Sequence, residues 1–79
     1  MAKLVNNDVF PVQAGEHNLA YVMSAGTAKL TYSVDGGAFI DVPDSAKTAT
    51  TGITVRLPSC QVLAVLTGDA ELSINRAEK

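Results

Sequence analysis

Nucleophilic chemistry has few residues to draw on in this chain, which contains one histidine, His17, and one cysteine, Cys60. A reactive nucleophile needs a base within hydrogen-bond reach. The sequence predicts His17 in a turn between two early strands and Cys60 beside the Pro58–Ser59 turn, so nothing in the pattern brings the two together. We therefore expect a surface histidine, and a cysteine that packs as a small hydrophobic residue.

Acidic residues and glycine-rich turns are the other features that could carry chemistry. Four aspartates could form a carboxylate pair, but they lie where turns favour aspartate: Asp35, Asp41, Asp44 and Asp69. Their spacing does not indicate a calcium loop, and one histidine with one cysteine makes no zinc-ligand cluster. Neither Ser24–Thr27 nor Asp35–Gly37 is a strand-to-helix junction of the kind that binds phosphate. We predict no enzymatic activity, no cofactor and no metal.

Length and charge restrict the classes of partner. The chain has 79 residues, enough for a single domain over 1–79, and its lone cysteine allows no intrachain disulfide. Six basic and eight acidic residues give a net charge of −2, and the basic residues form no block, which argues against nucleic acid. The longest apolar run, Val62–Leu66, is far too short to span a membrane, and the N-terminus lacks the apolar stretch of a signal peptide.

Alternation of apolar and polar residues predicts a β-hairpin in the middle of the chain. Thr27–Val34 alternates with period two, and Ala38–Val42 follows after a short turn. A three-residue loop places Tyr32 opposite Ile40 and keeps all the apolar residues on one face. This loop type requires a left-handed residue, which we assign to Gly37.

The C-terminal third has the same character. Apolar residues alternate over 53–57, the Pro58–Ser59 turn follows, and two further strands cover 61–67 and 70–75 around a Gly68–Asp69 turn. If these last two strands pair as a hairpin, Val65 lies opposite Leu72 and Leu63 lies opposite Ile74.

Shorter segments complete the predicted fold. We expect a strand over 19–23, an edge strand over 9–12 because Pro11 cannot donate to a ladder, an N-terminal arm over 1–8, and one long polar loop over 43–52. The fold class is therefore all-β: a small antiparallel β-sandwich, jelly-roll-like, or a barrel of six to eight short strands, with no helices.

The hairpin register has a consequence for Val62, Ala64 and Leu66. If Leu63 and Val65 face the core, these three apolar residues point to the opposite side of the sheet, where they need a cover. Either another strand or the N-terminal segment folds over them, or they form a docking face for a like subunit or a larger host surface. The predicted interface comprises Val62, Ala64, Leu66, Val5 and Phe10.

The chain resembles the small accessory proteins of tailed-bacteriophage virions, above all the head decoration, or capsid cement, proteins. The similarity lies in the Met-Ala-Lys-Leu start, the Tyr-Ser-x-Asp-Gly-Gly hairpin within Leu30–Ile40 and the strand pair within Leu57–Gly68. The resemblance implies a virion protein, made in the host cytoplasm without a signal peptide. It also implies a sandwich that binds the major capsid protein, and itself as a dimer or trimer, and stabilises the head lattice.

Two other functions fit the same pattern. A β module of a phage tail, fibre or baseplate would share the fold class and the composition. A carbohydrate-binding module would need exposed aromatic rings on which sugars stack. The chain has four aromatic residues, and at least two of them lie on predicted core faces: Phe10, Tyr21, Tyr32 and Phe39.

Overall fold

The computed structural model describes residues 2–77 and consists of eight β-strands joined by turns and loops. Met1, Glu78 and Lys79 of the predicted 1–79 domain lie outside the described residues. In chain order the strands are β1 (Ala2–Leu4), β2 (Val9–Val12), β3 (Gly15–Val22), β4 (Thr27–Ser33), β5 (Ile40–Asp41), β6 (Thr51–Leu57), β7 (Cys60–Thr67) and β8 (Glu71–Arg76).

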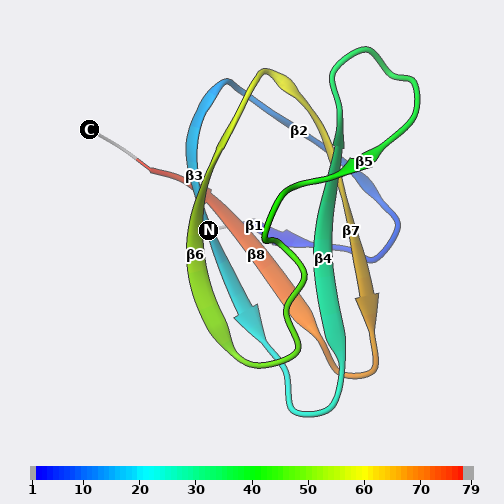
Figure 1. Cartoon of the computed structure of the whole chain (residues 1–79), viewed down its shortest axis with the longest axis vertical. Coiled ribbons are helices and arrows are strands. Elements are labelled where there is room, and N and C mark those ends of the chain that lie inside the picture. Colours follow the sequence, from blue (N-terminus) through cyan, green and yellow to red (C-terminus); the bar gives the residue numbers. More distant parts are fainter. Residues whose placement is uncertain (1, 78–79) are drawn as a thin grey trace.

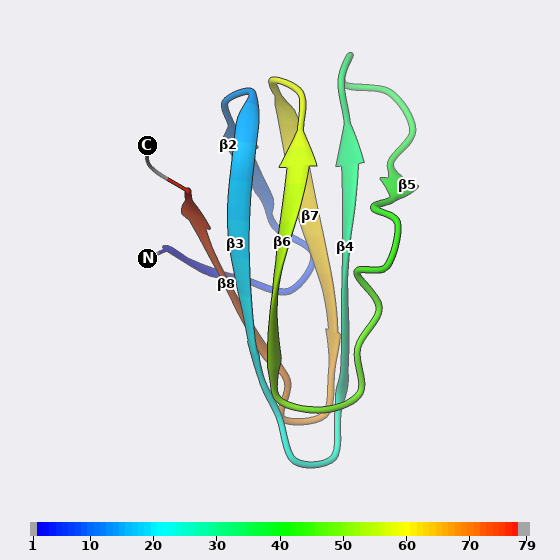
Figure 2. The same ribbon diagram turned by 60° about the vertical axis from the view of Figure 1, so that its left-hand side comes forward.

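The strands form two antiparallel sheets that pack face to face (Figures 1 and 2). One sheet has the order β1-β8-β3-β6 and the other β2-β7-β4-β5. No helix occurs between residues 2 and 77. The prediction of a small all-β fold is confirmed, and of the two architectures the sequence left open, the sandwich is the one observed.

The core lies between the sheets and follows the period-two alternation. Leu19 and Tyr21 of β3 and Leu72 of β8 come from one sheet, and Leu30 of β4 and Val62 of β7 come from the other. All five side chains are fully buried. Burial of apolar surface stabilises a fold by about 25 cal/mol per Å², so these inward faces account for much of the stability of so small a domain.

The central hairpin has the predicted register but a different turn. Tyr32 pairs with Ile40, as predicted. The prediction for Gly37 is wrong: Gly36 has the left-handed conformation, with φ of 78°. Pairing ends at Tyr32, so the loop is longer than three residues, and the Asp35 carboxylate accepts a 2.9 Å hydrogen bond from the Gly37 N–H. The Asp35 side chain therefore stabilises this turn, in place of the predicted three-residue loop with a left-handed Gly37.

The predicted β7–β8 hairpin is wrong, because the two strands belong to different sheets. The Gly68–Asp69 turn carries the chain across the sandwich, and β7 pairs with β2 and β4. In that register Val62 lies opposite Tyr32 and Ala64 lies opposite Leu30, on the core side. The faces of β7 are thus reversed relative to the prediction.

The N-terminal arm is built into both sheets. Residues 2–4 form β1, which pairs with β8 and buries Leu4. Beyond β1, the side-chain oxygen of Asn6 accepts a hydrogen bond from the Leu66 N–H at 2.9 Å, and the Asn7 N–H donates to the Ala64 carbonyl at 2.9 Å. The expectation of an arm over 1–8 is corrected accordingly: the segment links one sheet to the edge of the other.

The long loop follows the edge of β4 before it crosses to β6 (Figure 2). Lys47 and Ala28 exchange two backbone hydrogen bonds of 2.8 and 3.0 Å. The predicted range of 43–52 is too long, because β6 already begins at Thr51.

Two loops interlock at one end of the sandwich, where the loop after β3 and the turn after β7 lie side by side (Figures 1 and 2). The Asp69 carboxylate accepts hydrogen bonds of 3.1 Å from the backbone N–H groups of Ser24 and Ala25. The bonds from Ala25 and then Ser24 lower the pKa of Asp69 below its ordinary value of 3.8. The ionised carboxylate is therefore favoured in the folded state.

We expect the Asp69→Asn substitution to reduce the acid sensitivity of the fold. A lowered folded-state pKa contributes stability that is present above pH 3.8 and is lost as the pH falls through the folded-state value. Urea unfolding from neutral pH to below that range should show a shallower loss of stability for the variant than for the wild type. Parallel acid profiles for the two proteins would contradict this assignment.

Candidate functional site

The sequence predicted a surface histidine, and this prediction is wrong: His17 is buried on the inward face of β3. Its Nε2 donates a 2.8 Å hydrogen bond to the carbonyl oxygen of Gln13, so the ring closes the turn between β2 and β3. Position 17 lies inward because it shares a face with Leu19 and Tyr21, two residues and four residues further along the strand. The histidine thus has a structural role, its hydrogen bond to Gln13, that the local sequence did not predict.

A cavity of about 300 Å³ opens beside His17 between β2 and β8. Arg76 stands at its border and donates to the Gln13 side-chain oxygen at 3.0 Å and to the Ala14 carbonyl at 3.1 Å. Its lining contains no hydroxyl, thiol or carboxylate that His17 could activate. The lining residues are Phe10, Pro11, Val12, Gln13, His17, Ile74, Asn75 and Arg76.

Cys60 does not line this cavity. It is buried at the start of β7, where burial raises the pKa of its thiol. A thiol with a raised pKa holds little of the nucleophilic thiolate at neutral pH. The arrangement matches the expected small hydrophobic residue beside a turn.

Three of the four aspartates singled out in the sequence serve local structure. Asp35 and Asp69 accept backbone hydrogen bonds in turns, and Asp41 forms an ion pair with Lys29 at 3.3 Å. Within residues 2–77, no group of three or more histidine, cysteine or acidic side chains is placed to hold a metal ion.

The residues of the predicted interface are not brought together on one outer surface. Val62 and Ala64 are 0% exposed and belong to the core, and Leu66 and Phe10 are half-buried against it. Val5 alone is well exposed, at 62%. The opposite sheet covers Val62, Ala64 and Leu66. The docking face predicted on this side of β7 is therefore wrong.

An apolar surface lies instead on the reverse side of β7. Because Val62 and Ala64 point inward, Leu63 and Val65 point outward, and Leu63 lies directly opposite Val9 of β2. Val9 is 45% exposed, and Leu63 and Val65 are half-buried. With the exposed Pro11 on the same face of β2, these residues form what we call the outer stripe: Val9, Pro11, Leu63 and Val65.

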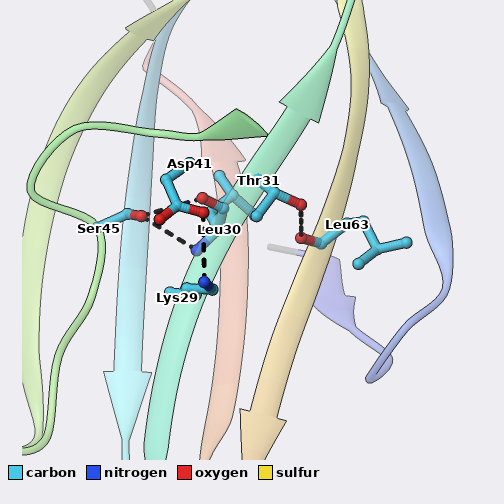
Figure 3. A network of polar contacts seen from close by, with 6 residues as sticks. All are labelled: Lys29, Leu30, Thr31, Asp41, Ser45 and Leu63. Carbon is cyan, nitrogen blue, oxygen red and sulfur yellow. Dashed lines mark hydrogen bonds and ion pairs between the residues drawn. The ribbon is translucent and has the colours of Figure 1, made fainter. Parts of the chain in front are cut away.

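Polar contacts on β4 and β5 border the outer stripe (Figure 3). The Thr31 hydroxyl donates to the Leu63 carbonyl at 2.8 Å, and the Lys29–Asp41 ion pair lies beyond it. The outer face of the other sheet is mostly polar, with pairs such as Thr54–Asn18 and Arg56–Glu16. An apolar centre with a polar border is the usual composition of a protein-binding surface.

The outer stripe could not be predicted from the sequence, because residues 62–66 are apolar at every position. Such a run has no alternation to show which side faces the core. Only the strands that pair with β7 decide which of its faces points to the core. The one signal in the sequence is Pro11, which favours an edge position for β2 beside another strand.

No family model, curated protein or solved structure matches the chain. None of the elements in residues 2–77 is a helix with the length and apolar character needed to cross a membrane.

Proposed function

We propose that this protein is a non-enzymatic structural protein of a tailed-phage virion, a decoration protein that binds the lattice of the head and stabilises it. The observation that supports this most is the outer stripe, a contiguous apolar surface on one face of a small sandwich whose other outer face is mostly polar. Apolar patches that monomeric proteins leave exposed commonly mark protein-binding sites. The occupant we propose is the major capsid protein.

The size of the stripe suits a repeated rather than a single attachment. Four short side chains, two of them already half-buried, offer only a weak individual contact. On a symmetric shell, many such contacts act together when copies of the protein are linked to one another. A small subunit that self-associates can therefore bind an assembled lattice well and its isolated building block poorly.

Three of the four aromatic side chains give no support to the carbohydrate alternative. Tyr21 is fully buried, and Phe10 and Tyr32 pack against the core. A sugar-stacking platform needs exposed rings on a common surface, and these three do not provide one.

The test is binding to purified heads that lack the protein, measured by co-sedimentation and by the number of copies per head. We expect binding to assembled heads and little binding to unassembled capsid subunits. Val9→Lys places a charge in the outer stripe and should weaken binding at least tenfold, because the lysine must be desolvated at an apolar contact. Its thermal melt should stay close to that of the wild type, since Val9 is exposed on an edge strand.

Val22→Lys is the matched control, because Val22 is a 55% exposed valine on the outer face of the other sheet. It should bind heads as the wild type does. Equal losses for the two variants would contradict the outer stripe as the binding surface. Binding to tails and not to heads would replace the head assignment with a tail or fibre module.

A further inference from the structure

The four outermost strands of the sandwich differ in how well they are protected against pairing with another chain. β1 has three residues, β5 has two, and β2 has four and contains Pro11, which lacks an N–H donor. Short edge strands and edge prolines are the usual means by which proteins block such pairing. Among the described strands, β6 is the outermost strand with neither device: its seven residues, Thr51–Leu57, pair with β3 on one side only.

The free side of β6 borders an open hollow. A cavity of about 410 Å³ lies between β6 and the first part of the long loop. Its apolar lining comes from Ile53 and Val55 of the strand and from Val42 and Pro43, and its polar lining comes from Thr54, Arg56, Asp44 and Lys47. Ile53 and Val55 are on the core face of their sheet but remain half-buried. A further strand beside β6 would bury both of them and would satisfy the outward-pointing backbone groups.

We propose that this edge binds a second copy of the same chain, with the two β6 strands antiparallel about a two-fold axis through Thr54. This register places Ile53 opposite Val55 of the second copy, twice, so that the half-buried apolar residues cover one another. The same register places Arg56 opposite Gly52 of the second copy.

Charge favours a like strand as the occupant. Arg56 is the one charged residue of β6, and it already forms a 3.3 Å ion pair with Glu16 of its own sheet. Opposite it, Gly52 offers no side chain and no charge, so the symmetric pairing opposes no like charges. The product is one continuous eight-stranded sheet with a closed, isologous interface.

The observations behind this inference are separate from those behind the proposed function, because they concern a different sheet from the one that carries the outer stripe. A two-fold axis that preserves the faces of the joined sheet runs perpendicular to it. Both outer stripes then lie on the same side of the dimer, free to contact another surface.

The first test is sedimentation equilibrium of the full chain over a wide concentration range, with two variants of opposite charge at one position. A Cβ at Gly52 would meet only the Leu19 carbonyl, at an ordinary 3.6 Å, so the monomer tolerates a side chain there. Gly52→Lys places a positive charge opposite Arg56 of the second copy at two symmetric positions and should weaken the dimer about tenfold. Gly52→Glu places a negative charge at the same positions and should strengthen the dimer. A wild type that stays monomeric throughout, or variants that shift in the same direction, would overturn the proposal.

The second test is cross-linking in a Cys60→Ala background. Thr54 and Asn18 lie opposite each other on the same outer face and share one 2.9 Å hydrogen bond, so Thr54→Cys and Asn18→Cys remove the same contact. Only Thr54 lies on the edge strand, next to its own copy across the two-fold axis. Thr54→Cys should form a disulfide-linked dimer on mild oxidation and Asn18→Cys should not; equal cross-linking of the two would reject the β6 interface.

Discussion

Replacement of Gly26 by alanine is expected to lower the free energy of unfolding by about 3 kcal/mol or more, at or above the upper end of the usual cost of overpacking. Gly26 is buried in the loop after β3, against the turn that joins β7 to β8. A Cβ atom there would overlap the carbonyl oxygen of Thr67 and lie 2.9 Å from the backbone nitrogen of Ala70. Both obstacles are backbone atoms, so no rotamer change can relieve the clash.

The turn on the other side of this contact has little freedom to retreat. Gly68 has φ of 62°, and a Cβ on it would lie 2.9 Å from the Gly26 Cα, so the two glycines approach closely from both sides. Asp69 also ties the turn to the backbone of Ser24 and Ala25. The interlocked loops must therefore separate before alanine fits, and the hydrogen bonds between them are lost with the separation.

Gly52→Ala is the matched control for this prediction. Its Cβ meets the Leu19 carbonyl at 3.6 Å, and glycine within a strand is less favourable than alanine by about 0.5–1 kcal/mol. Urea unfolding should therefore show a strongly destabilised Gly26→Ala variant and an unchanged or slightly stabilised Gly52→Ala variant. Similar midpoints for the two variants would show that the loops are not packed as described.

The sequence predicts the strands well because most of them face water on one side. In 27–33 and 53–57 the apolar residues alternate with polar ones, and this alternation is sufficient to locate β4 and β6. The Tyr32–Ile40 register agrees with it, because a slip of one residue near that turn puts a polar residue in the core. Loop geometry was less predictable, and the left-handed residue is Gly36, not Gly37.

The arrangement of the strands in space did not follow from the sequence. A two-residue turn at Gly68–Asp69 is compatible with a hairpin, but here it leads from one sheet to the other. The uniformly apolar residues 62–66 fit either orientation of β7, so the assumed hairpin reversed its faces. The candidate binding surface changed with it, from Val62 and Ala64 to the outer stripe. Long-range pairing decides such cases, and local pattern carries no information about it.

The long loop is a second feature that local pattern could not resolve. Residues 43–50 are small and polar, with no periodicity, yet Ser45 is as deeply buried as the core leucines. It lies beside β4 where β5 has ended. Its hydroxyl accepts a hydrogen bond from the Leu30 N–H at 3.1 Å and donates to the Leu30 carbonyl at 3.0 Å (Figure 3). Together with the Val42 N–H, which also donates to the Leu30 carbonyl at 2.9 Å, this side chain takes the place of a strand beside Leu30.

Substitution of Ser45 by alanine is therefore expected to destabilise the protein by about 1–3 kcal/mol, because it leaves the buried N–H of Leu30 without a partner, whereas the Leu30 carbonyl keeps its 2.9 Å hydrogen bond from the Val42 N–H. The contact from the opposite sheet should weaken with it. Tyr21 of that sheet donates a 2.7 Å hydrogen bond to the Ser45 carbonyl.

Burial raises the pKa of Tyr21 to about 12. In the wild type, the free energy of unfolding should therefore fall as the pH rises from 10 towards 12, because only the unfolded state ionises this tyrosine readily.

Ser33→Ala provides the comparison, since Ser33 is similarly buried but its hydroxyl makes one long contact of 3.5 Å with Asp35. Chemical denaturation should place this variant within about 1 kcal/mol of the wild type. Hydrogen exchange supplies a local readout: the Leu30 amide should lose protection in Ser45→Ala and keep it in Ser33→Ala. If the Leu30 amide exchanges equally slowly in both variants, then the Ser45 hydroxyl does not complete the edge of β4, and the segment after β5 is held to β4 by its backbone contacts with Ala28 and Leu30.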